Sequence, residues 1–412
     1  MRIGIVPSLK PHDGGVYQYS LTMLHALAEG RDKRDSDEIV VFAHDAGHPA
    51  VAELERREGC SVKPFRPPWK AERSAVLQTP RNLDEVLPQR DMRQWYHECG
   101  IELMVYPNPH RLSFETGIPY VMAIHDLQHR LQPQFPEVSA NGEWDRREYL
   151  FRNGARHATI LLADSEVGTQ DILDCYGCVG VTADRVRMLP FLPAVTEART
   201  SSQAERRTIQ DRYGLPERYL FYPAQFWPHK NHILVVEALG RLKKHQDLRI
   251  AVVFTGSHDG TLREQAFARM MATARLYEIE ERVHFLGHIP DEEIAALFTG
   301  ATALVMPTFF GPTNIPVLEA WSCGCPVLTS GIRGIREQVG DGGVLVDPNS
   351  TAAIADGIHR LWTDEALRAS LIERGRRRLA LYTRADYGQQ LEAIMEAARQ
   401  RVVAARAALA TS

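Results

Sequence analysis

Short apolar runs alternate along this chain with longer stretches in which apolar side chains recur every three or four positions. In the first half, the runs predict strands over residues 2–6, 38–43, 102–107, 119–126 and 158–165. Strands that read as continuous apolar runs are typical of parallel sheets with helices on both faces. The stretch 16–30 between two of these strands has helical spacing. The pattern therefore predicts β-α-β units.

The alternation is interrupted over 194–217, where the chain is polar and predicts no strand. It then resumes with predicted strands over 218–225, 249–256, 282–288, 302–308, 325–330 and 342–348. A chain of 412 residues suits two domains better than one hydrophobic core. We assign 1–200 to an N-terminal Rossmann-like domain and 201–380 to a C-terminal one. The remainder, 381–412, is predicted to be a helix that crosses back to the N-terminal domain.

The composition narrows the classes of function. Apolar residues make up 44% and charged residues 24%, as in an ordinary globular protein, and the net charge of −4 argues against a nucleic-acid partner. The six cysteines are too few for a disulfide scaffold, and Cys175 and Cys178 form one C-x-x-C pair where a zinc site needs two. No apolar run is long enough to span a bilayer, and residues 1–10 do not resemble a signal peptide. We therefore expect a cytoplasmic protein without a metal site.

The loop between the first predicted strand and helix contains Asp13, Gly14 and Gly15. In doubly wound sheets ligands bind at the carboxyl ends of the strands, and a cleft between two such domains is the expected site. Paired glycines let a ligand approach the backbone, and the helix N-terminus behind them favours an anion. The loop lacks the G-x-G-x-x-G pattern of dinucleotide-binding dehydrogenases. An ordinary tight turn is the alternative interpretation.

A lysine follows the strand predicted at 218–225. Lys230 stands just before a predicted helix, which we expect Asn231 to cap. At the mouth of a parallel sheet, an ammonium group can neutralise a phosphate. A solvated lysine without a ligand is the alternative.

Glu319 is the one acidic residue in the stretch 309–330, "FFGPTNIPVLEAWSCGCPVLTS". We expect Pro316 to be the first residue of a helix and Glu319 to fall in its first turn. The backbone amides of residues 313–315 are then free to point at a ligand. The carboxylate can accept hydrogen bonds from both hydroxyls of a vicinal diol, such as that of a ribose. The alternative is a carboxylate that offsets the helix dipole, worth about 0.3–1 kcal/mol.

Three segments, in this order and spacing, resemble the retaining glycosyltransferases of family four. They are "YPAQFWPHKNH" from residue 222, "VHFLGHIPDEEIAALF" from 283 and "IPVLEAWSCGCPVLTS" from 315. The N-terminal half is matched by the Gly14–Gly15 loop, by "AIHDL" at 123–127 and by "LADSE" at 162–166. The resemblance covers most of the chain. It implies the GT-B fold, an α/β architecture in which two Rossmann-like, doubly wound parallel-sheet domains face each other across a cleft.

The resemblance also implies transfer of a sugar from a nucleoside diphosphate sugar with the anomeric configuration kept. The C-terminal domain would bind this donor, and the N-terminal domain the acceptor. On this basis Glu319 holds the ribose, Lys230 the diphosphate, and His125 lies beside the donor sugar at the reacting centre. His125 and Lys230 are then the expected catalytic residues, although a hydrogen-bonded structural histidine is the alternative for His125. The other residues that the resemblance places at the donor are Gly14, Gly15, Gln225, His288, Thr313, Asn314, Ile315 and Leu318.

The chain departs from the family pattern at two positions. The family commonly has a second glutamate eight positions before the first, and that position is Gly311 here. The usual arginine ahead of the lysine is replaced by Gln225. The first change affects the contact to the donor sugar, and the second removes a positive charge from the diphosphate site.

Departure of the diphosphate is the demanding step, because negative charge builds on the leaving group. A lysine, a helix N-terminus and backbone amides are suited to stabilise that charge. This chemistry requires no metal, and the sequence shows neither a D-x-D cluster nor a glycosidase-type pair of carboxylates. We therefore expect no cofactor apart from the nucleotide sugar itself. In the family the base is usually taken to be a phosphate oxygen of the donor.

By similarity, the donor is a hexose such as GDP-mannose, and the acceptor is a glycan or lipid-linked glycan of surface polysaccharide synthesis. The stretch 63–95 combines surplus basic residues with prolines and two tryptophans, and it can contact an anionic membrane peripherally at its inner face. A solvated loop and helix is the alternative for this stretch. Two other functions stay open, a sugar-nucleotide epimerase and a non-catalytic scaffold of the same fold. An epimerase would change the donor sugar without any acceptor.

Overall fold

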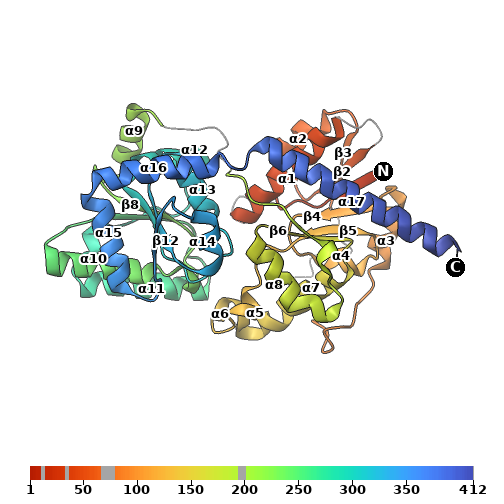
Figure 1. The fold of residues 1–412 in the computed structure, drawn as a ribbon, viewed down its shortest axis with the longest axis horizontal. Helices are drawn as coiled ribbons and strands as arrows, with labels where there is room; N and C mark the ends of the chain where they lie inside the picture. The colour runs from red at the N-terminus through yellow and green to blue at the C-terminus, as the bar shows by residue number, and fades with distance from the viewer. Residues whose placement is uncertain (11–13, 33–36, 66–78, 194–200, 412) are drawn as a thin grey trace. The chain divides into compact units, whose positions relative to one another are not determined.

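The computed structural model describes residues 1–10, 14–32, 37–65, 79–193 and 201–411. The chain divides into two compact units (Figure 1). Unit 1 comprises Met1–Gln134, Val138–Phe191 and Arg384–Ser412, and unit 2 comprises Phe135–Glu137 and Leu192–Thr383. The sequence placed the divisions after residues 200 and 380, and the structure has them after 191 and 383. All six cysteines are free thiols.

Unit 1 is built on a parallel sheet of seven strands in the order β3-β2-β1-β4-β5-β6-β7. β2 and β3 lie on one side of β1, and β4 to β7 lie on the other. The strand order therefore reverses between β1 and β4, where Ile3 pairs with Leu103. Such a reversal opens a ligand-binding crevice at the carboxyl ends of the two strands. The strands are β1 (Arg2–Ile5), β2 (Glu38–Ala43), β3 (Cys60–Pro64), β4 (Leu103–Tyr106), β5 (Tyr120–Ala123), β6 (Ile160–Ala163) and β7 (Val186–Met188).

The helices of unit 1 pack on this sheet and follow local signals in the sequence. Ser165 caps α8, for example, because its hydroxyl oxygen accepts a hydrogen bond from the Gly168 amide at 3.0 Å. The helices are α1 (Gly15–Asp32), α2 (Pro49–Glu55), α3 (Arg90–Glu98), α4 (Arg111–Glu115), α5 (Gln128–Leu131), α7 (Glu143–His157), α8 (Glu166–Tyr176) and α17 (Arg384–Thr411), with the short α6 (Pro136–Ser139) at the junction of the two units.

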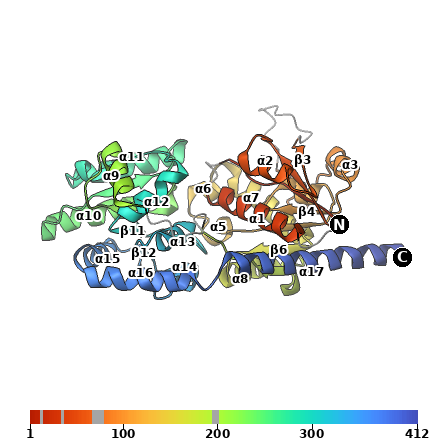
Figure 2. The same cartoon turned by 90° about the horizontal axis from the view of Figure 1, so that it is seen from above.

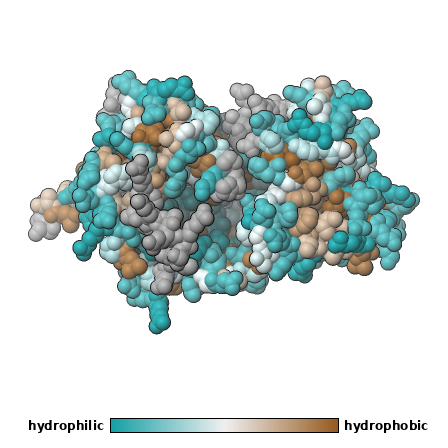
Figure 3. Space-filling view, turned by 180° about the vertical axis from the view of Figure 1, so that it is seen from behind, coloured by the Kyte–Doolittle hydropathy of each residue, from teal (hydrophilic) through white to brown (hydrophobic). Residues whose placement is uncertain are grey.

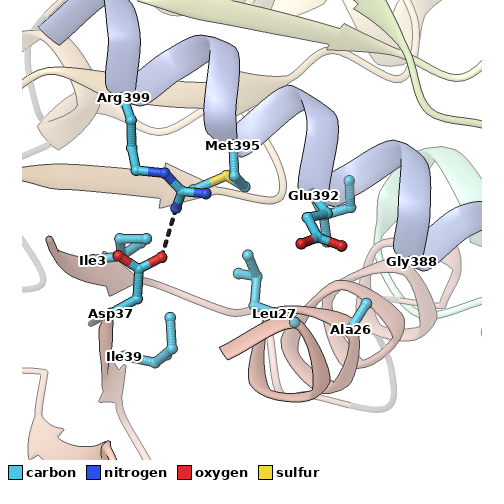
Figure 4. A pocket seen from close by; sticks show the side chains of 11 residues that line it. Ile3, Ala26, Leu27, Asp37, Ile39, Gly388, Glu392, Met395 and Arg399 are labelled. Carbon is cyan, nitrogen blue, oxygen red and sulfur yellow. Dashed lines mark hydrogen bonds and ion pairs between the residues drawn. The ribbon is translucent and has the colours of Figure 1, made fainter. Parts of the chain in front are cut away.

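Helix α17 lies along unit 1 beside α1, although more than 350 residues separate them in sequence (Figures 1 and 2). Residues of α1, β1, β2 and α17 line a small pocket, among them Leu27 of α1 and Met395 of α17 (Figure 4). At one end of this pocket Arg399 forms an ion pair of 2.7 Å with the buried Asp37. The pocket thus marks the seam along which the last helix is attached to the first β-α-β unit.

Unit 2 is built on a parallel sheet of six strands in the order β10-β9-β8-β11-β12-β13, and the strand order reverses between β8 and β11. The strands are β8 (Leu220–Pro223), β9 (Val252–Thr255), β10 (Val283–Phe285), β11 (Ala303–Met306), β12 (Val327–Ser330) and β13 (Val344–Val346). The helices are α9 (Gln203–Tyr213), α10 (His232–Gln246), α11 (Thr261–Leu276), α12 (Asp291–Gly300), α13 (Ile315–Ser322), α14 (Arg333–Val339), α15 (Thr351–Thr363) and α16 (Glu365–Leu379), with a short 3-10 helix η5 (Pro228–Lys230) before α10.

The predicted fold class of two doubly wound α/β units is confirmed. Every strand predicted in unit 2 is present, but β3 and β7 of unit 1 were missed. The two missed strands read CSVKP and VRM and include the charged residues Lys63 and Arg187, so neither forms a continuous apolar run. The polar stretch at 194–217 contains helix α9, which Ser202 and Glu205 start with a reciprocal capping box.

Hydrophilic side chains predominate on the face shown in Figure 3, and apolar ones form separate groups. Over the described residues, none of the helices combines the length and the apolar character that crossing a membrane requires. Residues 66–78, which lie in the first half of the stretch for which membrane contact was predicted, are outside the described residues. That contact stays a prediction.

Candidate functional site

The lysine loop, residues 224–231, follows β8 at the carboxyl edge of the unit 2 sheet. A side chain of β8 and hydrogen bonds within the loop hold the loop backbone in place. Lys230 closes η5 by donating its amide to the Trp227 carbonyl at 2.9 Å, and the Tyr222 hydroxyl donates to the Lys230 carbonyl. The Lys230 side chain is half-buried. The sequence thus placed Lys230 correctly at the mouth of the sheet, next to the strand-order reversal.

Asn231 is the N-cap residue of α10, as expected, but its side chain does not cap the helix. The residue has a left-handed backbone, with φ of 63°, and its side chain makes no capping hydrogen bond. Instead, its buried amide donates to the carbonyls of Pro307 and Pro348, each at 2.8 Å. Asn231 therefore ties the lysine loop to the ends of β11 and β13, a role that local sequence spacing does not reveal.

His229 links the lysine loop to the segment 135–137, which clusters with unit 2. Its amide and its Nδ1 both approach Oε1 of Glu137, at 3.1 and 2.7 Å. Burial raises the pKa of Glu137, but the hydrogen bonds from His229 outweigh burial and leave this pKa below its usual value. The carboxylate is thus held in its charged form beside the loop that carries Lys230.

The glycine loop, residues 307–314, follows β11 and lies against the lysine loop. The Phe309 amide donates to the His229 carbonyl at 2.8 Å, and the Thr308 hydroxyl donates to the same oxygen at 3.1 Å. These contacts join the loops that follow β8 and β11, on either side of the strand-order reversal. The two predicted donor-binding loops therefore meet at the place where doubly wound sheets bind ligands.

Gly311 occupies the position of the missing family glutamate, and its geometry explains why a side chain is absent. Its φ of +144° is a conformation that residues with a Cβ rarely adopt. A Cβ placed there would lie 3.0 Å from Oδ1 of Asn314 and 3.1 Å from its Nδ2. The Asn314 carboxamide thus occupies the space in which a side chain at 311 would begin.

The Asn314 amide was expected to be free for a ligand, and this part of the prediction was wrong. The amide donates to Oε1 of Gln338 at 2.9 Å, and Nε2 of Gln338 donates back to the Asn314 carbonyl at 2.9 Å. Gln338 lies on α14 and clamps the backbone just before α13. The Asn314 side chain is buried, and its Nδ2 has no hydrogen-bond partner among the described residues. Because it donates to Gln338, the backbone amide of Asn314 is not available to a ligand.

Glu319 lies in α13, but it is the fifth residue of the helix and not in its first turn. The helix begins at Ile315, so Pro316 is its second residue, one position later than expected. Glu319 is only 7% exposed. This burial argues against a simple effect on the helix dipole, because such carboxylates are normally solvated and lie within the first turn. Leu318 is half-buried, and Ile315 is buried at the helix start.

Gln225 opens the lysine loop and is bonded to two neighbours. Its Oε1 accepts hydrogen bonds from Nε1 of Trp227 at 3.0 Å and from Nη1 of Arg263 at 2.8 Å. The guanidinium carbon of Arg263 lies 4.6 Å from the centre of the Trp227 ring. Arg263 belongs to α11, which follows the neighbouring strand β9.

His288 lies in the loop after β10, two strands from β8, so roughly 10 Å along the edge. Its side chain is exposed. The preceding Gly287 accepts a hydrogen bond from the Gly256 amide at 2.8 Å, which joins the loops after β9 and β10. All of the donor residues predicted in this half of the chain therefore share one edge of the unit 2 sheet.

His125 follows β5 at the carboxyl edge of the unit 1 sheet and is half-buried. Its Nε2 lies 2.7 Å from the Pro107 carbonyl. Because a carbonyl only accepts, Nε2 carries the proton and Nδ1 of the neutral ring is an acceptor. The Tyr19 ring packs edge-on against the His125 ring, with 4.6 Å between the ring centres, and the centre of the Phe191 ring lies 5.3 Å from that of His125. Burial lowers the pKa of His125, so the ring is neutral near pH 7.

Gly14 stands just before α1, which begins at Gly15 at the same edge, and Asp13 of this loop lies outside the described residues. Gly14 has a φ of +59° and accepts the first helical hydrogen bond from the Gln18 amide at 3.2 Å. A Cβ at Gly14 would meet no atom within 4 Å. The glycine is therefore explained by its backbone conformation, and the space beside it is open. Tyr19 of the same helix contacts His125, so α1 links the two predicted regions of unit 1.

Sequence reasoning missed Gln338 and Arg263. Neither stands in a recognisable motif, and each acts through a contact with a residue 24 or more positions away. One signal was available for Arg263. The neutral Gln225 stands where the resembled family has an arginine, so another cation could be sought nearby. Within the described ranges, no cluster of three His, Cys, Asp or Glu side chains is placed to hold a metal ion.

The sequence of the chain is similar to those of known glycosyltransferases. Residues 205–378 match the family described as Glycosyl transferases group 1. Over 380 residues the chain is 24% identical to the O-antigen chain mannosyltransferase B of Escherichia coli, a match that covers 88% of this chain and 90% of that protein. A D-inositol 3-phosphate glycosyltransferase of Salinispora arenicola is 27% identical over 233 residues, which are 53% of this chain and 50% of that protein.

Solved structures show the same architecture. Anabaena HepE in complex with UDP and glucose superposes with a TM-score of 0.68 at 19% identity, covering 96% of this chain and 99% of that one. WaaG, a glycosyltransferase involved in lipopolysaccharide biosynthesis, superposes with a TM-score of 0.66 at 14% identity over 96% and 99% of the two chains. The chain therefore has the GT-B fold and carries, over residues 205–378, a domain of the Glycosyl transferases group 1 family.

Proposed function

We propose that the protein is a retaining hexosyltransferase that takes its sugar from a nucleoside diphosphate donor. The observation that carries the proposal is the meeting of the lysine loop and the glycine loop at the strand-order reversal of unit 2. This meeting puts a lysine, the N-terminal turn of α13 and the buried Glu319 at one edge of the sheet. A cation suits a diphosphate, and a buried carboxylate suits a ribose diol.

In this proposal Lys230 and the start of α13 stabilise the charge that develops on the departing diphosphate. Glu319 binds the ribose hydroxyls and so fixes the nucleotide. The Asn314 side-chain amide, which the backbone clamp of Gln338 leaves free to donate, contacts a hydroxyl of the donor sugar. No side chain is needed as the base, because a phosphate oxygen of the donor can take the acceptor proton on the face from which it leaves.

His125 is assigned to the reacting centre. Its proton is committed to Pro107, so Nδ1 can accept a hydrogen bond from a sugar hydroxyl. The neutral ring adds no positive charge there, and the aromatic rings of Tyr19 and Phe191 hold it in place. His125 is thus suited to orient a sugar rather than to bind phosphate.

We further propose GDP-mannose as donor and a glycan or lipid-linked glycan of a surface polysaccharide as acceptor. The similarity to the O-antigen chain mannosyltransferase B, which extends over 88% of this chain, supports both choices. No metal or other cofactor is assigned. The site of action is proposed to be the cytoplasm, with peripheral contact at the inner face of the membrane.

Calorimetry with GDP, UDP, ADP and their sugar conjugates tests the donor. We expect GDP to bind more tightly than UDP or ADP, and GDP-mannose to transfer mannose only when an acceptor glycan is added. Conversion of the donor sugar without an acceptor would instead indicate an epimerase, and no binding to any nucleoside diphosphate would indicate a scaffold. The anomeric configuration of the product, read by NMR, decides whether transfer is retaining.

A further inference from the structure

The position at which the resembled family carries an arginine is occupied by Gln225, and a guanidinium group is nevertheless present beside it. Arg263 donates Nη1 to Oε1 of Gln225 at 2.8 Å. It comes from α11, after β9, and not from the lysine loop itself. Because β8 and β9 are parallel neighbours, the loop after β8 and the start of α11 lie at the same edge of the sheet.

The guanidinium group is held in place without being neutralised. Its partners are the neutral oxygen of Gln225 and the face of the Trp227 ring, 4.6 Å from the guanidinium carbon. Trp227 in turn donates Nε1 to the same Gln225 oxygen at 3.0 Å, so one acceptor positions both side chains. Among the described residues, no carboxylate lies within ion-pair distance of Arg263.

The nearest acidic residues in sequence are engaged elsewhere. Asp259 accepts a hydrogen bond from the Ser257 hydroxyl at 2.8 Å, and Glu264 accepts one from the Gly260 amide at 3.2 Å. By contrast, Arg212 on α9 is paired with Glu293. An ordered, half-buried arginine without a counter-ion attracts an anionic ligand more strongly than a neutralised one, since charge-assisted hydrogen bonds to phosphate are strong and often bidentate.

We propose that Arg263 binds the diphosphate of the donor and supplies the positive charge that is missing at position 225. This inference rests on the proposed function, because it adds a second cation to the site of Lys230. Gln225 and Trp227 are positioning residues, which aim the guanidinium group at the ligand. The charge has thus moved from the lysine loop to the first turn of the neighbouring helix, while the chemistry offered to the diphosphate stays the same.

The test compares GDP with guanosine by calorimetry. Arg263→Gln is expected to weaken GDP binding roughly 10- to 100-fold, the range for losing a hydrogen bond to a charged group, and to leave guanosine unchanged. Arg269→Gln is the matched control, because Arg269 is exposed on the same helix and the change in charge is identical. It is expected to bind GDP as the wild type does.

Two changes at position 225 separate charge from structure. Gln225→Glu keeps the shape of the side chain but gives Arg263 a counter-ion, so it is expected to weaken GDP binding about as much as Arg263→Gln, with guanosine unaffected. The double variant Gln225→Arg, Arg263→Gln returns the charge to the family position. It is expected to recover GDP binding to within a few-fold of the wild type.

Several results would overturn the inference. They are wild-type GDP binding by Arg263→Gln, equal losses for GDP and guanosine, and a double variant no better than Arg263→Gln alone. If Lys230→Ala loses GDP but Arg263→Gln does not, only the role of Arg263 fails. If the wild type itself binds no nucleoside diphosphate, the proposed function fails instead.

Discussion

At the carboxyl edge of the unit 1 sheet, His125 is enclosed by the rings of Tyr19 and Phe191, whereas the same edge of unit 2 carries Lys230 and Arg263. The histidine is neutral, because burial lowers its pKa. Both sheets have the same doubly wound topology with one strand-order reversal. The fold therefore provides the location of each site, and the side chains decide whether it suits a neutral sugar or an anionic diphosphate. Variants on the two edges should accordingly fail in different ways.

The largest effect is expected at His125, on the carboxyl edge of the unit 1 sheet. His125→Ala should lower turnover by about 100-fold, as for loss of one group that stabilises a transition state, and should change donor affinity little. Steady-state kinetics and calorimetry with GDP-mannose provide the two measurements. His125→Phe keeps the ring contacts and should lose turnover as well. His97→Ala, an exposed histidine of unit 1, is the control. Wild-type turnover in both His125 variants would make this residue structural.

At the carboxyl edge of the unit 2 sheet, Lys230→Ala should weaken nucleoside diphosphate binding by about 1.5–3 kcal/mol, the range for hydrogen bonds to charged groups. The nucleoside alone should bind almost unchanged, because it has no phosphate to lose. Lys244→Ala, an exposed lysine on α10, should bind both ligands normally. Equal losses for the diphosphate and the nucleoside would remove Lys230 from the diphosphate site.

A substitution at Glu319 tests whether the carboxyl edge of the unit 2 sheet also binds the ribose. Glu319→Gln should weaken a ribonucleotide by about 1.5–3 kcal/mol and should hardly affect its 2′,3′-dideoxy analogue, which has no diol. Titrating both ligands into both proteins gives the coupling between the carboxylate and the hydroxyls. A similar penalty for the two ligands would mean that Glu319 only supports its helix.

The smallest effect, counted per pH unit, concerns His232, the buried first residue of α10 in unit 2. It is stacked between Tyr222 and Phe226, and burial lowers its pKa to about 3, helped by the charge of Lys230. In the unfolded chain His232 takes up a proton near pH 6.5, whereas in the folded chain it stays neutral until about pH 3. Stability should therefore fall below pH 6.5 by up to about 1.4 kcal/mol per pH unit.

Denaturant unfolding between pH 7 and 4, followed for the wild type and His232→Phe, measures this slope. The phenylalanine keeps the stacked ring and removes the proton site, so the variant should lose less stability with falling pH. An unchanged slope would assign the pH dependence to other groups.

The sequence predicted part of the unit 2 edge and missed the rest. The positions of Lys230 and Glu319 at the carboxyl edge could be predicted because each follows a predicted strand, and a strand is marked by its own apolar run. Asn231 does not cap with its side chain, because its amide reaches Pro307 and Pro348, which follow two strands that only the folded sheet brings near. Gln338 and Arg263 escaped notice for the same reason. Local spacing predicts which residues lie at an edge, but hydrogen bonds between loops depend on the sheet order.

Gly311 shows a different limit. A missing glutamate reads as a loss in the sequence, yet in the structure the Asn314 carboxamide occupies the space beside the glycine. The φ of +144° at Gly311 has no signature in a single sequence, since glycine is also found where no unusual backbone is needed. The substitution is therefore better understood as an exchange of one polar group for another than as a deletion.

The attachment of α17 to unit 1 has a consequence for the order of events during protein synthesis. The ribosome makes the whole of unit 2 before it reaches Arg384, so the apolar surface of Leu27 and Ile39 and the carboxylate of Asp37 remain uncovered in the meantime. Unit 2 has nearly all of its residues in one continuous stretch and can complete its core first. Unit 1 is made first but completed last, because its seam stays open until α17 emerges.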